Sequence, residues 1–282
     1  MRIGLIPSEG VAAVLHGGSR KWWDLDVPVD ITVYGSTREQ ERALESGETD
    51  IVFMNALSAM ILRSQGLPLV ALTTFSRVRK DILASPKSDA IRLADLTEVA
   101  VSHGTTIEYY TDLLLQLEGV DSRAVRKVEI SSMEGRLDAL IDGTVGAAML
   151  PSPLAHVAVQ RGARILATNL VLDPPPREAY LVAREAWLAD HEDEVRAILP
   201  NLQRSIDELN ADASTYREAV ALAMGEHAAN LPEFELTPIP DLAPCPETTH
   251  AAFESWLTEH GLLQRPVSYA ELVAPIGVGA PT

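Results

Sequence analysis

The chain has 282 residues, 46% of them hydrophobic, and a mean hydropathy of +0.05, which is the composition of a folded protein with ample core. Its 40 acidic and 23 basic side chains give a formal net charge of −17, which argues against nucleic-acid binding because the phosphate backbone would be repelled. The single cysteine, Cys245, excludes a disulfide within the chain and a metal site built from cysteines.

Short apolar runs alternate with helical patterns in the first part of the chain. Such runs are predicted to form buried parallel strands, because strands covered on both faces need no polar side. They are residues 3–6, 31–34 and 51–54. Helices are predicted over 37–46 and 56–65, and each ends at a glycine, Gly47 or Gly66, a common helix stop.

A helix with a defined start opens the next part of the chain. Thr105 and Glu108 have the T-x-x-E spacing of a capping box, in which two side chains bond to each other's backbone amides. The helix is predicted to continue through a run of leucines to Gly119. In this interpretation the helix start occupies the Glu108 carboxylate.

The chain repeats itself at an offset of 96 residues. The segment ALESGETDIVFMNALSAMILRSQGLPLV, from Ala43, lies without a gap over ALIDGTVGAAMLPSPLAHVAVQRGARIL, from Ala139. Extended backwards, the same offset places RIGLIPS near EVAVSHG and DITVYGS on RKVEISS. Strands that alternate with helices in two such halves predict an α/β fold of two similar, doubly wound lobes joined by a two-strand hinge.

The last third of the chain is predicted to be mostly helical. The proline run before residue 177 cannot continue a helix or a central strand, so it is interpreted as chain returning from the second lobe to the first, with the other passage near 85–89. The predicted division is 1–84 plus 177–282 for the first lobe and 85–176 for the second, with a ligand cleft between them.

Ligands of open parallel sheets bind outside the carboxyl ends of the strands, and the loops there are rich in Ser, Thr, Gly and Asn. In the first lobe the predicted ligand-binding residues are Ser8, Glu9, Ser36, Asn55, Ala56, Thr74 and Ser76. In the second lobe they are His103, Gly104, Thr105, Thr106, Ser132, Met133, Pro151 and Ser152.

His103 and Glu9 are the two candidates for proton transfer. Each follows the first strand of its lobe, where a neutral imidazole or a carboxylate would reach a ligand. The favoured interpretation of His103 is a ligand hydrogen bond or a packed loop, because no second titratable residue sits beside it to tune it. For Glu9 a solvated carboxylate at a helix start is at least as well supported. No catalytic residue is therefore assigned, and His103 and Glu9 are the candidates if the protein is an enzyme.

Other chemistry is poorly supported by the sequence. The histidines lack metal-ligand spacing, and neither a Walker loop nor a G-x-G-x-x-G turn is present, so no metal and no cofactor are predicted. Trp22 and Trp23, after His16-Gly17-Gly18, would offer a stacking surface to an aromatic or heterocyclic ligand, although half-buried packing is the commoner role of such pairs.

The two lobes, GLPLVAL after a strand, LADLTEVAVSHGTT at the opening of the second lobe, and the C-terminal WLTEHGLLQRPVSYAELV resemble substrate-binding proteins of ABC importers. The nearest resemblance is to the nitrate, sulfonate and thiamine-precursor type with the type 2 periplasmic binding protein fold. It implies a monomer that captures a small molecule, anionic or heterocyclic, by hinge closure and delivers it to a membrane permease. Neither nucleic acid nor a cofactor is implied.

The location of the protein is left open by the sequence. No apolar run approaches the roughly 20 residues of a spanning helix, and MRIGLIPSEG is not a secretory leader, so the chain as written is expected in the cytoplasm, or outside it if a leader was removed. The fold also resembles cytosolic enzymes acting on small acids, including chorismate dehydratase and a dihydroxyphthalate decarboxylase. A cytosolic lyase acting on a small cyclic acid is the alternative function.

Overall fold

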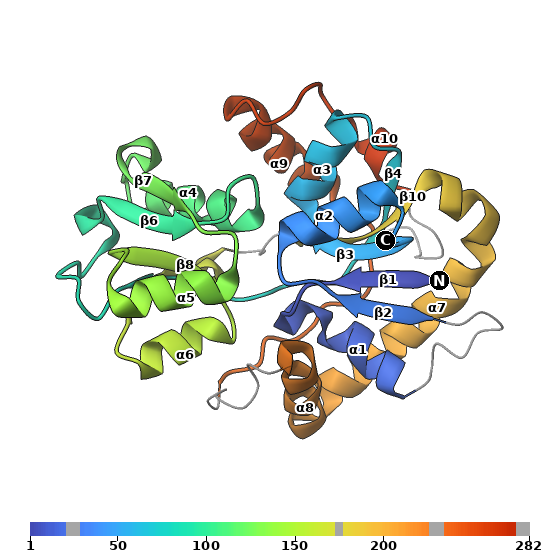
Figure 1. Ribbon diagram of the computed structural model, residues 1–282, viewed down its shortest axis with the longest axis horizontal. Helices are drawn as coiled ribbons and strands as arrows, with labels where there is room; N and C mark the ends of the chain where they lie inside the picture. The colour runs from blue at the N-terminus through green and yellow to red at the C-terminus, as the bar shows by residue number, and fades with distance from the viewer. Residues whose placement is uncertain (21–28, 173–176, 226–233, 275–282) are drawn as a thin grey trace. The chain divides into compact units, whose positions relative to one another are not determined.

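The computed structural model describes residues 1–20, 29–172, 177–225 and 234–274. The chain divides into two compact units, each built around its own sheet flanked by helices (Figure 1). The first unit comprises Met1–Arg77, Pro176–Gly225 and Leu236–Thr282, and the second comprises Val78–Pro175 and Glu226–Glu235. None of the described helices is both long and apolar enough to cross a membrane.

The sheet of the first unit has the strand order β2-β1-β3-β10-β4. Its strands are β1 (Arg2–Leu5), β2 (Asp30–Val33), β3 (Ile51–Asn55), β4 (Leu69–Thr74) and β10 (Ala179–Arg184). β1 pairs in parallel with β2 and β3, whereas β10 runs antiparallel to both β3 and β4. The amino end of β10 therefore lies beside the carboxyl ends of β3 and β4.

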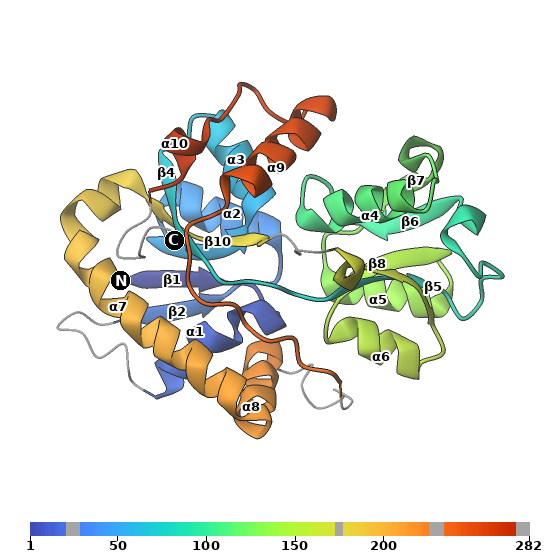
Figure 2. The same cartoon turned by 180° about the vertical axis from the view of Figure 1, so that it is seen from behind.

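The helices of the first unit come from both ends of the chain. They are η1 (Glu9–Val11), α1 (Ala12–Ser19), α2 (Thr37–Ser46), α3 (Ala56–Ser64), α7 (Glu185–Ala211), α8 (Ala213–Met224), α9 (Glu247–Glu259) and α10 (Tyr269–Leu272). α1 packs against α7 and α8, an arrangement visible from behind in Figure 2. α9 packs against α3, and α10 against β4, so the C-terminal part of the chain covers this side of the sheet.

The sheet of the second unit has the order β7-β6-β8-β5-β9. Its strands are β5 (Lys80–Ala84), β6 (Glu98–Val101), β7 (Arg126–Glu129), β8 (Ala147–Pro151) and β9 (Arg164–Thr168). Its helices are η2 (Leu93–Asp95), α4 (Thr106–Leu117), η3 (Ser122–Ala124), α5 (Met133–Asp142), α6 (Leu154–Gln160) and η4 (Asn169–Val171). β5 runs antiparallel to β8 and β9 and takes the place that β10 has in the first sheet.

The predicted repeat is confirmed at the level of whole elements. The bounds of β1, β2, α2 and β3 become those of β6, β7, α5 and β8 when 96 is added to each. The helix stops also correspond, since Gly47 and Gly143 both adopt the left-handed conformation, with φ of 75° and 79°. A residue with a side chain is strained in that conformation, which explains glycine at both turns. The fold therefore consists of two similar α/β lobes.

The division of the chain differs in two respects from the predicted boundaries. β5 falls within the predicted first lobe, yet it pairs with β8 and β9 in the second sheet. The units divide after Arg77, ahead of β5, and the predicted return passage at 173–176 lies outside the described residues. A further piece of the second unit comes from the late part of the chain, where the Phe234 ring lies 5.5 Å from the His156 ring.

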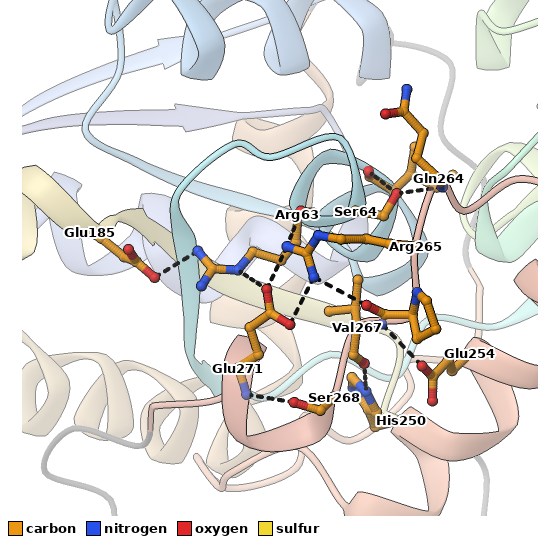
Figure 3. A network of polar contacts seen from close by, with 12 residues as sticks. Arg63, Ser64, Glu185, His250, Glu254, Gln264, Arg265, Val267, Ser268 and Glu271 are labelled. Atoms are coloured by element: carbon orange, nitrogen blue, oxygen red, sulfur yellow. Dashed lines mark hydrogen bonds and ion pairs between the residues drawn. The ribbon is translucent and has the colours of Figure 1, made fainter.

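A polar network fixes the C-terminal segment to α3 at the amino-end edge of the first sheet (Figure 3). The Glu271 carboxylate receives hydrogen bonds from Arg63 Nε, at 3.2 Å, and from both terminal nitrogens of Arg265, at 2.9 and 2.5 Å. Arg63 also pairs with Glu185 at 2.6 Å. Arg63 thus bonds to both Glu271 and Glu185, and these pairs hold α10 and the start of α7 against the end of α3.

Candidate functional site

The carboxyl-end edge of the first sheet begins its helices with side-chain caps. Ser36 Oγ accepts a hydrogen bond from the amide of Glu39, at 3.3 Å. Asn55 Oδ1 accepts one from the amide of Ser58 at 2.9 Å, and Asn55 Nδ2 donates to Ser58 Oγ at 2.9 Å. Such caps satisfy amides that a helix start would otherwise leave unbonded. The two predicted ligand-binding residues are thus engaged in starting α2 and α3.

Glu9 is a buried carboxylate rather than the solvated one considered from sequence. Its side chain is 1% exposed, and Oε1 accepts hydrogen bonds from Tyr216 Oη and from the amide of Thr237, both at 3.2 Å. Burial, and then the nearby Glu9 charge, raise the pKa of Tyr216 well above its ordinary value. Glu9 therefore joins α8 and the chain near Thr237 to the start of α1. Ser8, just before it, is half-buried and makes no capping bond.

The remaining predicted residues of the first edge are buried, one at the end of β4, one at the start of α3 and one after β4. Thr74 Oγ1 donates to the carbonyl of Ala179 at 2.6 Å, which ties the end of β4 to the start of β10. The amide of Ala56 donates to the carbonyl of Glu178 at 2.9 Å. Ser76 is 3% exposed. The contacts of Thr74 and Ala56 are structural ones.

His103 in the second unit contacts two carboxylates, one of them 5 and the other 26 residues away in sequence. Its Nδ1 is 2.9 Å from Glu108 Oε1, and its backbone amide donates to Glu129 Oε2 at 2.6 Å. The side chain is 42% exposed. His103 thus has carboxylate neighbours in space, brought to it by α4 and β7, although no titratable residue sits directly beside it in sequence.

The predicted capping box at the start of α4 is also wrong in its second half. Thr105 does cap the helix, since its Oγ1 accepts from the amide of Ile107 at 3.2 Å and donates to the carbonyl of Ser102 at 2.7 Å. Glu108 Oε2, however, accepts from the amide of Gly104 at 2.9 Å, one residue earlier than a capping box requires. Gly104 has a φ of 68°, which lets the loop turn back on Glu108. Thr106, the first residue of α4, is buried.

The loop after β7 presents two serine hydroxyls, and both are bonded to carboxylates. Ser131 Oγ donates to Glu129 Oε1 at 2.5 Å, and Ser132 Oγ donates to Glu134 Oε2 at 3.0 Å. Ser132 is also the cap of α5, accepting from the amide of Gly135 at 3.1 Å. Met133, the first residue of that helix, is half-buried.

The loop after β8 carries a buried hydroxyl. Ser152 is 1% exposed, and its amide donates to the carbonyl of Arg79 at 2.8 Å. Its Oγ has no hydrogen-bond partner within the described part of the chain. Pro151, directly before it, is the last residue of β8 and pairs with Lys80 of β5.

Sequence reasoning missed Arg136, a residue of α5 that contacts strand β8 and the loop after β7. Its side chain is 1% exposed, and its Nε donates to the carbonyl of Met149 at 3.1 Å. Its Nη1 donates to the carbonyls of Ile130, at 2.7 Å, and Ser131, at 3.2 Å. Burial lowers the pKa of Arg136 to about 10, while the nearby Glu129 and Glu134 act to raise it. The guanidinium thus remains charged at neutral pH.

The 96-residue offset would have found Arg136, because it places this residue on Gln40 of the first unit. Gln40 is fully buried and donates from Nε2 to the carbonyls of Gly4, at 3.0 Å, and Phe53, at 2.9 Å. Phe53 in turn corresponds to Met149. A buried polar residue in the same place of two amphipathic helices is a pattern that sequence alone can reveal.

The described residues hold no group of three or more His, Cys, Asp or Glu side chains placed to bind a metal ion. The carboxyl-end edges of the two sheets carry backbone amides and hydroxyls that donate hydrogen bonds. In the second unit these donors are bonded to Glu108, Glu129 and Glu134, above the buried positive charge of Arg136.

Comparison with protein families gives one match over residues 24–221, more than half of the chain. The matching family is described as the periplasmic substrate-binding protein of phosphonate ABC transporters. No curated protein matches the chain.

Solved structures of similar fold cover nearly the whole chain at low sequence identity. The alkanesulfonate-binding protein SsuA from Xanthomonas axonopodis pv. citri, bound to MOPS, has a TM-score of 0.79 and 17% identity, with 98% of each chain covered. The periplasmic nitrate-binding protein NrtA from Synechocystis PCC 6803 has a TM-score of 0.76 and 13% identity, covering 96% of this chain and 85% of that one.

A third structure is the ligand-binding component of an ABC-type import system from Staphylococcus aureus, solved with zinc bound. It has a TM-score of 0.77 and 16% identity, and covers 98% of this chain and 96% of that one. At such identities these likenesses describe the fold, which places no constraint on the ligand.

Proposed function

The chain belongs to the periplasmic substrate-binding proteins of phosphonate ABC transporters, and from this premise we propose that it captures a small organic oxyanion of the phosphonate or sulfonate class. Members of this family serve ABC import systems, so a small-molecule ligand and a membrane permease are its partners. The family is periplasmic, and the comparisons offer no support for the cytoplasmic location expected from the sequence as written.

The hydrogen bonds of one carboxylate, Glu129, carry the proposal that the ligand is an oxyanion. The Glu129 carboxylate accepts one bond from the amide of His103 and another from the hydroxyl of Ser131, so donors from the loops after β6 and β7 converge on a single anionic group. A phosphonate or sulfonate has oxygens of similar charge and reach, and would compete for the same donors. The Glu129 carboxylate therefore accepts the hydrogen bonds that we propose for an oxyanion of the ligand.

The residues proposed to contact the ligand are those at the carboxyl ends of the strands in each lobe. In the second lobe they are His103, Gly104, Thr105, Thr106, Ser132, Met133, Pro151 and Ser152. In the first lobe they are Ser8, Glu9, Ser36, Asn55, Ala56, Thr74 and Ser76. The buried hydroxyl of Ser152 supports its place in this set, because an unpaired buried hydroxyl is costly unless a ligand or water bonds to it.

The experiment that tests this function is native mass spectrometry of the protein purified from its own host, followed by calorimetric titration with methylphosphonate, methanesulfonate and nitrate. Binding of methylphosphonate or methanesulfonate with one site per chain is the expected result. Failure of all three to bind, together with a co-purified cation or neutral molecule, would contradict the proposal.

A lyase on the same fold is favoured by a single observation. The half-exposed imidazole of His103 has Nδ1 against Glu108, the arrangement that orients a histidine for proton transfer from Nε2. Turnover of a small cyclic acid, lost in His103→Ala and Glu9→Ala, would support the enzyme. If the protein binds its ligand without turnover, and neither substitution changes this binding, the lyase function is excluded.

The protein is further proposed to act as a monomer, in keeping with a ligand site formed within one chain. Light scattering at micromolar concentration should give a mass near 30.5 kDa, with and without ligand. A stable dimer would overturn this part of the proposal.

A further inference from the structure

Arg136 joins the loop after β7 to strand β8. Its three acceptors are the carbonyls of Ile130 and Ser131, which directly precede Ser132, and the carbonyl of Met149 within β8, which precedes Pro151 and Ser152 by two and three residues. The guanidinium is thus bonded to the backbone directly before Ser132, and a ligand bound by Ser132 would lie on the loop that this charge holds.

No carboxylate among the described residues forms an ion pair with Arg136, although the guanidinium is 1% exposed. It also sits near the start of α5, where the helix dipole disfavours a positive charge. A buried cation without a bonded anion is costly, and proteins retain such arrangements where an anion completes them.

The first lobe shows that the carbonyl bridge does not need this charge. Gln40, at the corresponding position, bridges two carbonyls with a neutral amide and is fully buried like Arg136. The carbonyl of Phe53 or Met149, which the two positions share as acceptor, is thus bonded by an uncharged side chain in one lobe and by a cation in the other. The other acceptors differ, since Gln40 reaches Gly4 whereas Arg136 reaches Ile130 and Ser131. Bonding to the shared carbonyl therefore does not explain the positive charge of Arg136.

We propose that Arg136 is the charge-selecting residue of the ligand site, acting from beneath the loops of the second lobe to favour ligands with two negative charges over those with one. The inference rests on the proposed function and deepens it, since it assigns the charge preference of that site to one residue. Arg136 acts through the field of its charge and through the loop carbonyls that it positions.

Two carboxylates on the same loops oppose this field. Glu129 and Glu134 bond to the hydroxyls of Ser131 and Ser132, and the Glu129 side chain is 33% exposed. Solvent screens the partly exposed Glu129 more than the buried Arg136, and Glu108, which is 8% exposed, is already bonded to His103 and to the amide of Gly104. An arriving oxyanion would also displace these carboxylates from the hydroxyls.

The first arm of the test needs no ligand. In a Ser132→Cys background, the rate of thiol alkylation by iodoacetamide against pH reports the local potential, because the thiolate is the reactive form. Arg136→Gln should lower the rate at pH 7 by about tenfold and move the profile up by about one pH unit, whereas Arg136→Lys should not. Cys245 does not interfere, since it is 2% exposed and burial raises its pKa to about 11.

The second arm measures affinity for methylphosphonate at pH 8.5, where it is largely a dianion, and for methanesulfonate, a monoanion of similar size. Arg136→Gln should weaken methylphosphonate binding by at least about tenfold more than methanesulfonate binding, and Arg136→Lys should restore the difference. Circular dichroism and melting temperature establish that each variant is folded. Gln40 gives the reason to expect folding of Arg136→Gln.

The outcomes separate the inference from the function on which it rests. An unchanged alkylation profile in Arg136→Gln, or equal weakening of both anions, overturns the role of Arg136. A shifted profile with no binding of either anion to the parent protein supports the field of Arg136 and contradicts the proposed function. A purely structural role would weaken both anions equally in Arg136→Gln and in Arg136→Lys.

Discussion

The two lobes share one scaffold and differ in the charges placed on it. At the carboxyl-end edge, Gln40, Val33 and Ala12 of the first lobe correspond to Arg136, Glu129 and Glu108 of the second. The first set is neutral, and the second brings a buried cation and two carboxylates to the loops. The bounds of β1, β2, α2 and β3 match those of β6, β7, α5 and β8, so this part of the scaffold forms in the first lobe without these charges, which are better explained by function.

The amino-end edges differ in the same way. In the first lobe Asp50 is 4% exposed and receives three hydrogen bonds from Arg2, at 2.9, 3.1 and 2.6 Å, and one from Arg184, at 3.2 Å. In the second lobe Gly146 replaces Asp50, and its amide donates to Glu98, which also pairs with Arg126 on the surface. A buried carboxylate bonded to two arginines therefore lies at the amino-end edge of the first sheet, where the second sheet has Gly146.

The edge strands that occupy corresponding places are covered to different extents. All residues of β4 are buried, because the C-terminal chain forms bridges to it from Ala243 and Val273. β9 in the second lobe is only partly covered. The C-terminal third of the chain thus stabilises one lobe and leaves the other with less burial.

The largest expected effect is a loss of stability at a position that the C-terminal chain covers, compared with the corresponding position that is exposed. Leu69 and Ile165 correspond at the repeat offset, and Leu69 is 0% exposed whereas Ile165 is 43% exposed. Leu69→Ala should lower the free energy of unfolding by about 4 kcal/mol, through lost burial and a cavity. Ile165→Ala should lower it by about 0.5 kcal/mol. Urea unfolding followed by circular dichroism measures both, and equal losses would refute the proposed role of the C-terminal cover.

The next effect concerns the ion cluster of the first lobe. Asp50→Ala should lower the free energy of unfolding by about 3 kcal/mol, because it leaves Arg2 and Arg184 without their shared partner. Glu98→Ala in the second lobe should lower it by about 1 kcal/mol, since its partner Arg126 is exposed. A Glu98→Ala loss as large as that of Asp50→Ala would contradict the comparison.

Acid should weaken the same cluster. Burial raises the pKa of Asp50, but the hydrogen bonds and charge of Arg2, with a bond from Arg184, outweigh it and hold this pKa below the ordinary value. The resulting stability is present above the unfolded-state pKa of about 4 and is lost as the pH falls through the lower folded-state pKa. The urea midpoint of the wild type should therefore fall below about pH 4 more steeply than that of Asp50→Asn. Parallel curves for the two proteins would exclude this account.

A smaller effect tests whether Gln40 is the neutral counterpart of Arg136. Gln40→Ala should lower the free energy of unfolding by about 2 kcal/mol, because the carbonyls of Gly4 and Phe53 lose a buried donor. Gln40→Glu should be worse, since a carboxylate cannot donate to either carbonyl. Thermal unfolding checks both, and a Gln40→Glu variant as stable as the wild type would show that the bridge is dispensable.

The smallest expected effect is on ligand affinity at the carboxyl-end edge of the second sheet. Glu129→Gln keeps an oxygen for the amide of His103 while removing the charge that competes with an oxyanion. Methylphosphonate should then bind about tenfold more tightly, which is about 1.4 kcal/mol. Glu98→Gln, at the opposite edge of the same sheet, is the matched control and should leave the affinity unchanged. Weaker binding by Glu129→Gln would mean that Glu129 contacts the ligand favourably.

Much of the fold was open to prediction because it depends on local patterns and on the repeat. Apolar runs, glycine stops and the 96-residue offset gave the strands and helices of both lobes with their order. The placement of β5 was not predictable, because pairing with β8 and β9 depends on contacts distant in sequence. Its apolar residues suit either sheet equally well.

The candidate site was predicted less completely. Caps such as Ser36, Ser132 and Thr105 follow from local spacing. The contacts of His103 with Glu129, and of Glu9 with Tyr216, join residues 26 and 207 positions apart, which no spacing reveals. Arg136 could have been found from the repeat, but a cation on a helix is more often a solvated residue than a buried one.

The most direct test of the account is one calorimetric series with methylphosphonate on the wild type, Glu129→Gln and Arg136→Gln in the same buffer. If the loops of the second lobe bind an oxyanion above the Arg136 charge, affinity should rise from Arg136→Gln through the wild type to Glu129→Gln, with roughly tenfold between neighbours. Equal affinities for the three proteins, or the reverse order, would contradict it.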